Sequence, residues 1–368
     1  VGNLPTRNFR DGAFPEVNKI SAKTIKDTIS VGMEGCYACP VKCKKVVEFK
    51  GPYYVDPAYG GPEYETLGAL GSNCGVDDVN AVSMASALCN AYAIDTISTG
   101  GTIAFAMECF ENGILTKEDT GGIDLQFGNA DAMMKIVEMI AKREGIGDIL
   151  AEGSARAAEK IGKGAEAYAV QVKKLEFPMH EPRLNKSLAL GFMVNPHGAD
   201  HCCNLIDFFA KDSENPDMVT VPEAQKLGLP SAPFDDIGPD KVAIFRVVQL
   251  GKIVFDTLAI CQFLPYSLEQ LAKATSAVTG WDITGEELLK ASEKTLTLSR
   301  MFNLRQGLTA EDDKLPDRCF KPTKFGALKD TALDAEKLEK AKKHYYSLMG
   351  WDKNGVPLDE KLKELGVS

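Results

Sequence analysis

The chain has 368 residues, of which 44% are hydrophobic and 26% are charged, a composition typical of a globular protein with a substantial core. Its net charge of −10, without a basic block, argues against nucleic acid or an anionic membrane as a partner. No apolar run approaches the roughly 20 residues that span a bilayer, and Val1 to Arg10 lacks the apolar core of a signal peptide. We therefore expect a cytoplasmic protein. Since the chain begins with Val1 and not Met, we also expect it to be a fragment.

The predicted elements are mainly helices. Asp77 and Asp78 are placed to cap the first of them, and Thr284 with Glu287 forms the pattern of a capping box before a later one. Strand signals are few, and the segment from residue 211 to 239 has the composition of a long surface insertion. Helices are expected over residues 79–89, 98–112, 131–143, 149–161, 239–258 and 335–346, and strands over residues 46–49 and 169–172.

This pattern predicts a mainly α, multihelical fold with two all-α domains. An extended segment ends in two prolines near residues 177–182, which indicates a boundary. We place the domains at residues 1–175 and 176–368. Gly-Trp-Asp occurs twice, around Trp281 and Trp351, and we interpret both occurrences as turns that bury the tryptophan.

Three of the ten cysteines are closely spaced. Cys36, Cys39 and Cys43 form a C-x-x-C-x-x-x-C motif, and three thiolates this close can bind one metal centre with little loop-closure entropy. Both a cubane iron–sulfur cluster and a structural zinc site need four ligands. The other reading is a loop with three free thiols. The candidates for a fourth ligand are Cys74, Cys202, Cys203, Cys261 and Cys319.

Two hexapeptides with a similar pattern each end a predicted helix. One runs from Asn90 to Asp95 and the other from Asp256 to Cys261. Both have a polar first residue, a small fourth residue and an aliphatic fifth residue, which is Ile94 or Ile260. Small residues let the backbone approach a flat ligand, and carboxylates can accept hydrogen bonds from the ring N–H groups of a pterin. The alternative is two helix ends that look alike by chance.

Taken together, these residues resemble the tungsten-containing aldehyde:ferredoxin oxidoreductase family. The resemblance extends from residues 4–9, Leu-Pro-Thr-Arg-Asn-Phe, to the C-terminus. It includes Gly-Pro-Glu-Tyr-Glu-Thr at residues 61–66, His-Gly-Ala-Asp-His at 197–201 and Phe-Asn-Leu-Arg at 302–305. It implies the two all-α C-terminal domains of that family, without the N-terminal domain that covers the other face of the cofactor.

The resemblance also implies the cofactors. In that family the cysteine triplet and a distant cysteine, here Cys261, hold one [4Fe-4S] cluster. The two hexapeptides match the segments that bind a tungsten (or molybdenum) bis-pterin, and they include Asn90, Ile94, Asp95, Asp256 and Ile260. This sequence departs from the family pattern where Asn90 replaces Asp, and where Ala93 and Ala259 replace Gly.

The reaction implied is oxidation of an aldehyde to a carboxylic acid, with electrons passed through the cluster to ferredoxin. Glu65 matches the family's active-site glutamate, with Glu63 as the fallback, and would act as general base. His201 matches the histidine that donates a hydrogen bond to the carbonyl oxygen. His180 is a candidate for the lining of the substrate channel.

The expected partners are ferredoxin, a small aldehyde, and an N-terminal domain or companion chain; a homodimer stays open. Lys42, Lys44 and Lys45 would attract an acidic ferredoxin, or else serve only solubility. Two alternatives to the enzyme stay open. One is an electron-transfer or scaffold module that binds the cluster without substrate chemistry, and the other is a helical protein stabilised by zinc.

Overall fold

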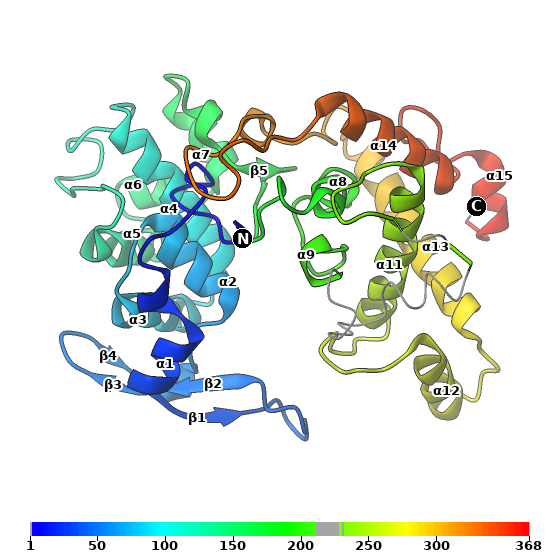
Figure 1. The fold of residues 1–368 in the computed structure, drawn as a ribbon, viewed down its shortest axis with the longest axis horizontal. Helices are drawn as coiled ribbons and strands as arrows, with labels where there is room; N and C mark the ends of the chain where they lie inside the picture. The colour runs from blue at the N-terminus through cyan, green and yellow to red at the C-terminus, as the bar shows by residue number, and fades with distance from the viewer. Residues whose placement is uncertain (1, 211–227, 230–231, 368) are drawn as a thin grey trace. The chain divides into compact units, whose positions relative to one another are not determined.

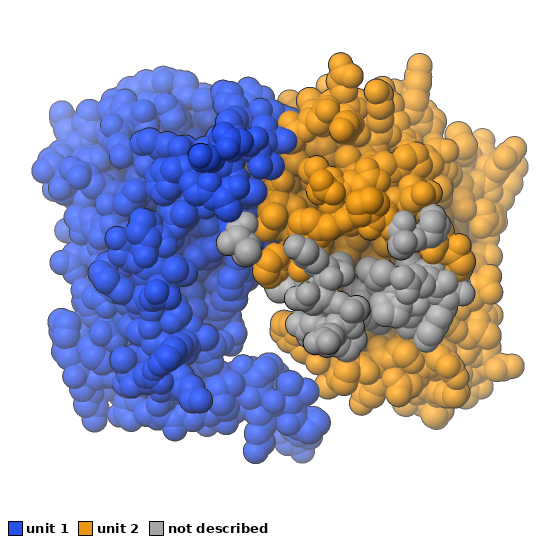
Figure 2. All heavy atoms as spheres, viewed as in Figure 1, with its two compact units in different colours: residues 1–181, 316–332 blue, residues 182–315, 333–368 orange. Residues whose placement is uncertain are grey.

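The computed structural model describes residues 2–210, 228–229 and 232–367, and most of the predicted surface insertion lies outside this range. The chain forms two compact units, drawn in blue and orange in Figure 2. Unit 1 contains Val1–Glu181 and Pro316–Ala332, and unit 2 contains Pro182–Leu315 and Leu333–Ser368. The chain thus passes from unit 1 to unit 2 between Glu181 and Pro182, close to the boundary that the prolines indicated. The later segment Pro316–Ala332 returns to unit 1. The placement of the domains at residues 1–175 and 176–368 stays a prediction.

Unit 1 is built around α4 (Thr96–Glu111), a helix that is buried on nearly every side from Thr99 to Cys109. At Gly100 an added Cβ would lie 2.6 Å from the backbone of Ala69, so glycine permits the close contact with the π-helical turn Leu67–Gly71. The other helices of this unit, seen in Figure 1, are α1 (Ala22–Thr28), α2 (Tyr64–Thr66), α3 (Val79–Tyr92), α5 (Ala130–Lys142), α6 (Ile146–Leu150) and α7 (Ser154–Ile161).

In the residues that the structure describes, three small antiparallel sheets complete unit 1, each with two strands. The largest pairs β1 (Ser30–Glu34) with β2 (Lys44–Val47), and it lies next to the pair β3 (Phe49–Lys50) and β4 (Tyr54–Val55) in Figure 1. The third pairs β5 (Gln171–Val172) with β6 (Leu175–Glu176). Only Val47 among the residues of β1 and β2 is fully buried.

The N-terminal segment is held in unit 1 by a buried ionic network. Asn8 donates to Glu108 Oε2 at 2.6 Å, and Arg318 of the returning segment contacts the same carboxylate oxygen at 2.9 Å. Lys324 N–H donates to the carbonyl of Arg10 at 3.1 Å. Residues from opposite ends of the sequence therefore share one core.

Unit 2 is all helical in its described residues and centres on α11 (Pro239–Thr257) and α13 (Gly285–Arg305), which pack against each other. Thr284 accepts from the N–H of Glu287, and the Glu287 carboxylate accepts from the N–H of Thr284 at 2.8 Å. The predicted capping box is therefore present. The other helices are α8 (Lys186–Val194), α9 (Asp207–Ala210), α12 (Leu268–Thr279), α14 (Ala335–Leu348) and α15 (Asp359–Glu364).

A second buried ionic network stabilises unit 2. Asp313 is fully buried, and its carboxylate accepts hydrogen bonds from Arg300 Nη1 at 2.8 Å and from the Tyr346 hydroxyl. Arg300 also donates to the carbonyl of Gly355 at 2.8 Å, and its guanidinium lies 5.7 Å from the ring centroid of Trp351. This network joins α13 to the segment that follows α14.

The predicted mainly α architecture is confirmed. One predicted helix was wrong in detail: residues 149–161 are divided between α6 and α7, because Gly153 interrupts them with a φ of 84°. Trp351 is 4% exposed, as predicted, whereas Trp281 is 66% exposed. The interpretation of Trp281 as a buried turn residue was therefore wrong. No described helix is long and apolar enough to cross a membrane.

Candidate functional site

The three closely spaced cysteines lie on the loop that joins β1 to β2. Pairing of Glu34 with Lys44 brings the two ends of this loop together, and Cys39 N–H donates to the carbonyl of Cys36 at 3.0 Å to close a tight turn. Cys36 and Cys43 are exposed and Cys39 is half-buried. Their sulfurs are thus not used in core packing, as a ligand loop requires.

Burial separates the candidates for a fourth ligand. Cys261, just after the end of α11 in unit 2, is exposed, whereas Cys74, Cys203 and Cys319 are buried and Cys202 is half-buried. Burial raises the pKa of the Cys74 and Cys203 thiols well above the usual range. Since the thiolate is the form that binds metals, those two cysteines fit packing better than ligation.

The two hexapeptides end their helices in the same way. The fourth residue is left-handed in each, with φ of 54° at Ala93 and 53° at Ala259. The N–H of Ile94 donates to the carbonyl of Cys89 at 3.0 Å, and the N–H of Ile260 donates to that of Phe255 at 2.9 Å. This six-to-one bond after a left-handed residue is the Schellman helix end. Glycine at the fourth place of the family pattern therefore suits the backbone conformation, which the sequence alone did not reveal.

Side chains of the hexapeptides hold their ends in place. Asn90 Nδ2 donates to the carbonyl of Tyr59 at 3.2 Å, and Asp95 caps α4 by accepting from Ser98 N–H at 2.6 Å. Ile94 and Ile260 are half-buried against the cores of their own units. Asn90, Asp95 and Asp256 are exposed, which leaves room for a ligand beside both helix ends.

A buried thiol supports Asp256 from within unit 2. Cys203 Sγ donates to Asp256 Oδ2 at 2.9 Å. The pKa of Cys203 is raised by burial first and then by the charges of Asp200 and Asp256, so the thiol keeps the proton that it donates. No local pattern in the sequence marks this contact, because 53 residues separate the two side chains.

The proposed base Glu65 lies on the one-turn helix α2. Its Oε2 accepts from the N–H of Met179 at 2.7 Å, and its Oε1 lies 3.0 Å from His180 Nε2. His180 is 3% exposed. The fallback residue Glu63 instead points toward β2, where its carboxylate pairs with Lys45 at 2.7 Å. The structure brings Glu65 together with a buried histidine and places Glu63 in a surface ion pair.

His201 lies in unit 2, on the loop between α8 and α9, and is half-buried. The ligand atoms of Asp200, His201 and Cys202 lie within 4.8 Å of one another. Burial raises the pKa of Asp200. Hydrogen bonds from the backbone N–H groups of Cys203 and Cys202, together with the charges of His201 and His197, lower the pKa by more than burial raises it. The pKa of Asp200 is therefore below its usual value. An ionised Asp200 therefore lies next to His201.

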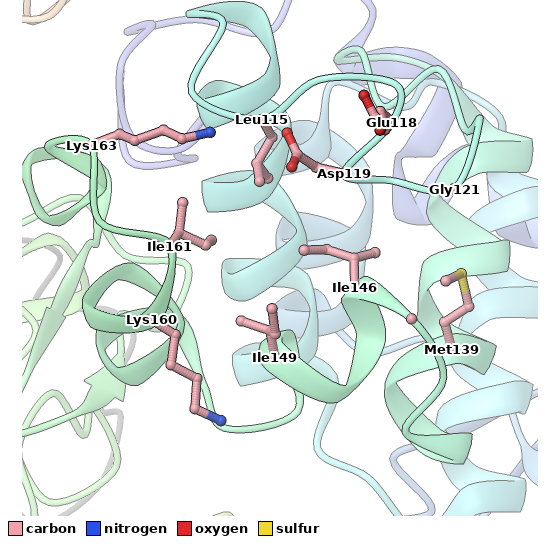
Figure 3. A pocket seen from close by; sticks show the side chains of 11 residues that line it. Leu115, Glu118, Asp119, Gly121, Met139, Ile146, Ile149, Lys160, Ile161 and Lys163 are labelled. Atoms are coloured by element: carbon pink, nitrogen blue, oxygen red, sulfur yellow. The ribbon is translucent and has the colours of Figure 1, made fainter.

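A separate hollow of about 440 Å³ lies on unit 1, between α5, α6 and α7 (Figure 3). Ile146, Ile149 and Ile161 form its apolar wall, and Asp119 and Lys160 are at its edge. None of the predicted site residues lines this hollow, so it is not a candidate for the cofactor site.

Comparison with known proteins identifies the same family that the sequence motifs resemble. The family model described as aldehyde ferredoxin oxidoreductase, domains 2 and 3, matches residues 1–367. The tungsten-containing aldehyde ferredoxin oxidoreductase of Pyrococcus furiosus is 34% identical over 375 residues, which cover 100% of this chain and 58% of that protein. A second protein of that organism, the WOR-like subunit of an aliphatic sulfonate oxidoreductase, is 30% identical over 90% of this chain and 50% of its own length.

A solved structure also shares the fold. It is the active-site complex BamBC of benzoyl-coenzyme A reductase with 1,5-dienoyl-CoA, with a TM-score of 0.75 and 25% identity. The match covers 100% of this chain and 58% of that one. The chain therefore spans a little over half the length of the relatives that it matches.

Proposed function

Because the chain belongs to the aldehyde ferredoxin oxidoreductase family, of which it forms domains 2 and 3, we propose that it is part of an enzyme that oxidises aldehydes to carboxylic acids. The observation that carries this proposal is an exposed three-cysteine loop together with two helix ends of one geometry, the second of which leads to Cys261. The rest of the active site comes, in this proposal, from an N-terminal domain or a companion chain, and the enzyme acts in the cytoplasm.

The residues present fit the two cofactors that the family implies. Cys36, Cys43 and Cys261 are exposed and Cys39 is half-buried, and these four cysteines would hold a [4Fe-4S] cluster. Asn90, Asp95 and Asp256, at the exposed helix ends, would receive hydrogen bonds from a pterin. When bound, a tungsten or molybdenum bis-pterin supplies two-electron redox chemistry, and the cluster passes the electrons on singly.

The side chains of the chain would then handle the proton and the carbonyl group. Glu65 would accept a proton from water or from the hydrated aldehyde, since its carboxylate is held in one orientation by Met179 N–H. His201 would donate a hydrogen bond to the carbonyl oxygen as negative charge develops there. Both roles require the side chain to be fixed before the reaction.

Ferredoxin is the proposed electron acceptor. Lys42 and Lys44 are exposed on and beside the cysteine loop, while Lys45 is paired with Glu63. The ammonium groups of Lys42 and Lys44 form no ion pair with the residues that the structure describes, and they would attract an acidic protein locally, despite the net charge of −10 for the chain.

The alternative function is an electron-transfer or scaffold module that binds a cluster without substrate chemistry. The exposed cysteine loop alone is consistent with such a module. The contacts of Glu65 favour the enzyme, because a carrier has no need of a carboxylate that is held by the N–H of Met179 and lies beside a buried histidine.

Metal analysis of protein purified without oxygen tests the proposal. We expect about four iron and four acid-labile sulfide per chain, the cubane stoichiometry, together with tungsten or molybdenum. Iron and sulfide without either heavy metal in the complete protein would favour the electron-transfer module. One zinc per chain without sulfide would contradict both readings.

A further inference from the structure

We propose that Cys203 is a positioning residue whose thiol orients the carboxylate of Asp256 for the proposed pterin. The inference deepens the proposed function and rests on it for the role of Asp256. It is carried by contacts within unit 2, between the turn at residues 200–204 and the helix α11.

The contact between Cys203 and Asp256 has a fixed direction. Cys203 Sγ lies 2.9 Å from Asp256 Oδ2, and an ionised carboxylate can only accept a hydrogen bond. The thiol must therefore donate. Burial, and then the charges of Asp200 and Asp256, raise the pKa of Cys203, so the proton stays on the sulfur. A thiol is a weak donor, but a charged acceptor makes a hydrogen bond roughly twice as strong as a neutral one.

The side chain of Asp200 fixes the backbone on which this thiol is carried. Its Oδ1 accepts from the N–H of Cys202 at 3.1 Å, and its Oδ2 accepts from the N–H of Cys203 at 2.9 Å. Both carboxylate oxygens thus hold consecutive peptide groups of the 200–204 turn. The sulfur of Cys203 therefore reaches Asp256 from a backbone that has little freedom of its own.

A buried chain of polar side chains holds the end of the same turn. Asn204 Nδ2 donates to the carbonyl of Asp200 at 2.6 Å, and Gln249 Nε2 donates to Asn204 Oδ1 at 3.0 Å. The Tyr345 hydroxyl donates to Gln249 Oε1 at 2.6 Å. Since a carbonyl can only accept, it fixes the orientation of the Asn204 amide, which in turn fixes that of Gln249. Both amides are 0% exposed, so a broken bond would leave a buried polar group without a partner.

The helix α11 holds the 200–204 turn at two points on one face. Gln249 and Asp256 are seven residues apart on this helix, which places them on the same side of it. Asn204 binds the first and Cys203 binds the second. Behind the turn, a Cβ at Gly191 of α8 would lie 2.5 Å from Asn204 Cγ, so glycine permits the close packing of this amide.

Two parts of the proposed site consequently depend on one turn. Asp256 is exposed, and its Oδ2 is bound by a donor that is itself buried. A ligand beside this helix end would therefore meet a carboxylate whose orientation is already set, which lowers the entropy lost on binding. His201, the proposed donor to the carbonyl oxygen, belongs to the same turn.

The S–H stretching vibration gives a test that needs neither cofactor nor activity. Infrared spectra of the complete protein show thiol bands in a region clear of other protein absorption, and Cys203→Ala identifies the band of Cys203. We expect Asp256→Ala to move that band to higher frequency, because the acceptor is lost. Asp240→Ala, in the first turn of α11, should leave the band in place. A band that does not move in Asp256→Ala would overturn the proposal, whether or not the enzyme assignment is correct.

A matched pair of variants tests the effect on the cofactor in the complete, loaded enzyme. Serine keeps a donor at position 203, whereas alanine has none. We expect Cys203→Ala to release the pterin, with its tungsten or molybdenum, about tenfold faster than the wild type. Cys203→Ser should stay within about threefold of the wild type, because its hydroxyl can still donate to Asp256. Fluorescence of the released, oxidised pterin and the metal content of the protein measure the release.

Thermal unfolding of each variant separates positioning from folding. Equal release rates in folded Cys203→Ser and Cys203→Ala would show that the donor has no role, and the proposal would then fail. A wild-type protein without pterin would instead refute the proposed function, and the S–H band would still decide whether Cys203 donates to Asp256. If the Cys203 variants do not fold, the difference spectrum between wild type and Asp256→Ala, changed at an exposed residue, decides the contact.

Discussion

Two alanines occupy a backbone conformation that favours glycine. Ala93 and Ala259 have φ values of 54° and 53°, and a side chain in this left-handed region costs roughly 1–2 kcal/mol relative to the right-handed one. The small residue at this place of each hexapeptide is thus explained by the helix end itself. Close approach of a ligand is therefore not needed to explain why the fourth residue is small.

Glycine at these two positions should stabilise the protein. We expect Ala93→Gly and Ala259→Gly each to raise the free energy of unfolding by about 0.5 kcal/mol, the relief of strain less the added entropy of the unfolded chain. Ala91→Gly, an exposed residue within α3, is the control and should lower it by about 1 kcal/mol. Denaturant unfolding measures all three, and destabilisation by both hexapeptide variants would contradict this account.

The exposure of single cysteines gives a second prediction. We expect Cys261→Ala to lose the iron of the cluster, whereas Cys319→Ala, which removes a buried thiol, should keep it. Iron and acid-labile sulfide per chain are the measurement. Equal iron content in the two variants would remove Cys261 from the ligand set.

At the scale of elements, the sequence predicts helices best where a cap and a periodic apolar face coincide. Asp78 accepts from the N–H groups of Asn80 and Ala81 at the start of α3, as expected. The helix α12 was missed, although Ser267 and Gln270 form a capping box before it. Strand β1 was missed because its residues are exposed on both faces, so no alternation of apolar and polar residues marks it.

The candidate site was predictable only in part, for a related reason. The cysteine spacing and the two hexapeptides are local patterns that are visible in the sequence. The contact of Glu65 with Met179 joins residues 114 positions apart, and nothing local marks it. His180 was singled out as a possible channel residue, but its pairing with Glu65 depends on tertiary packing.

The capping box of α13 provides a test at this scale. We expect Thr284→Ala to lower the free energy of unfolding by about 1 kcal/mol, because the N–H of Glu287 loses its acceptor. Thr284→Ser keeps the hydroxyl and is the matched control. Chemical denaturation of both variants checks the expectation, and an equal loss in both would point to the Thr284 methyl group instead.

At the scale of the whole molecule, each unit depends on a buried charge network that links distant parts of the chain. In unit 2, Asp313 and Arg300 are both almost completely buried, and their side chains meet at 2.8 Å. Removal of one member of such a pair leaves an uncompensated charge in the core. The cost therefore exceeds that of a surface ion pair several-fold.

Replacement of Asp313 should consequently destabilise the protein strongly. We expect Asp313→Ala to lower the free energy of unfolding by about 3–5 kcal/mol, because Arg300 stays buried without its partner. Glu311→Ala, two residues earlier and exposed, should change it by less than about 0.5 kcal/mol. A loss below about 1 kcal/mol for Asp313→Ala would show that Arg300 finds another partner or water.

The return of Pro316–Ala332 to unit 1 has a consequence for synthesis on the ribosome. Arg318, whose guanidinium completes the Glu108 network, is made 210 residues after the glutamate it contacts. At about 5–20 residues per second, the N-terminal unit must wait ten seconds or more for the arginine that neutralises that carboxylate. Translation rate and chaperones that shield nascent chains should therefore affect the yield of folded protein more than in a chain whose units are continuous in sequence.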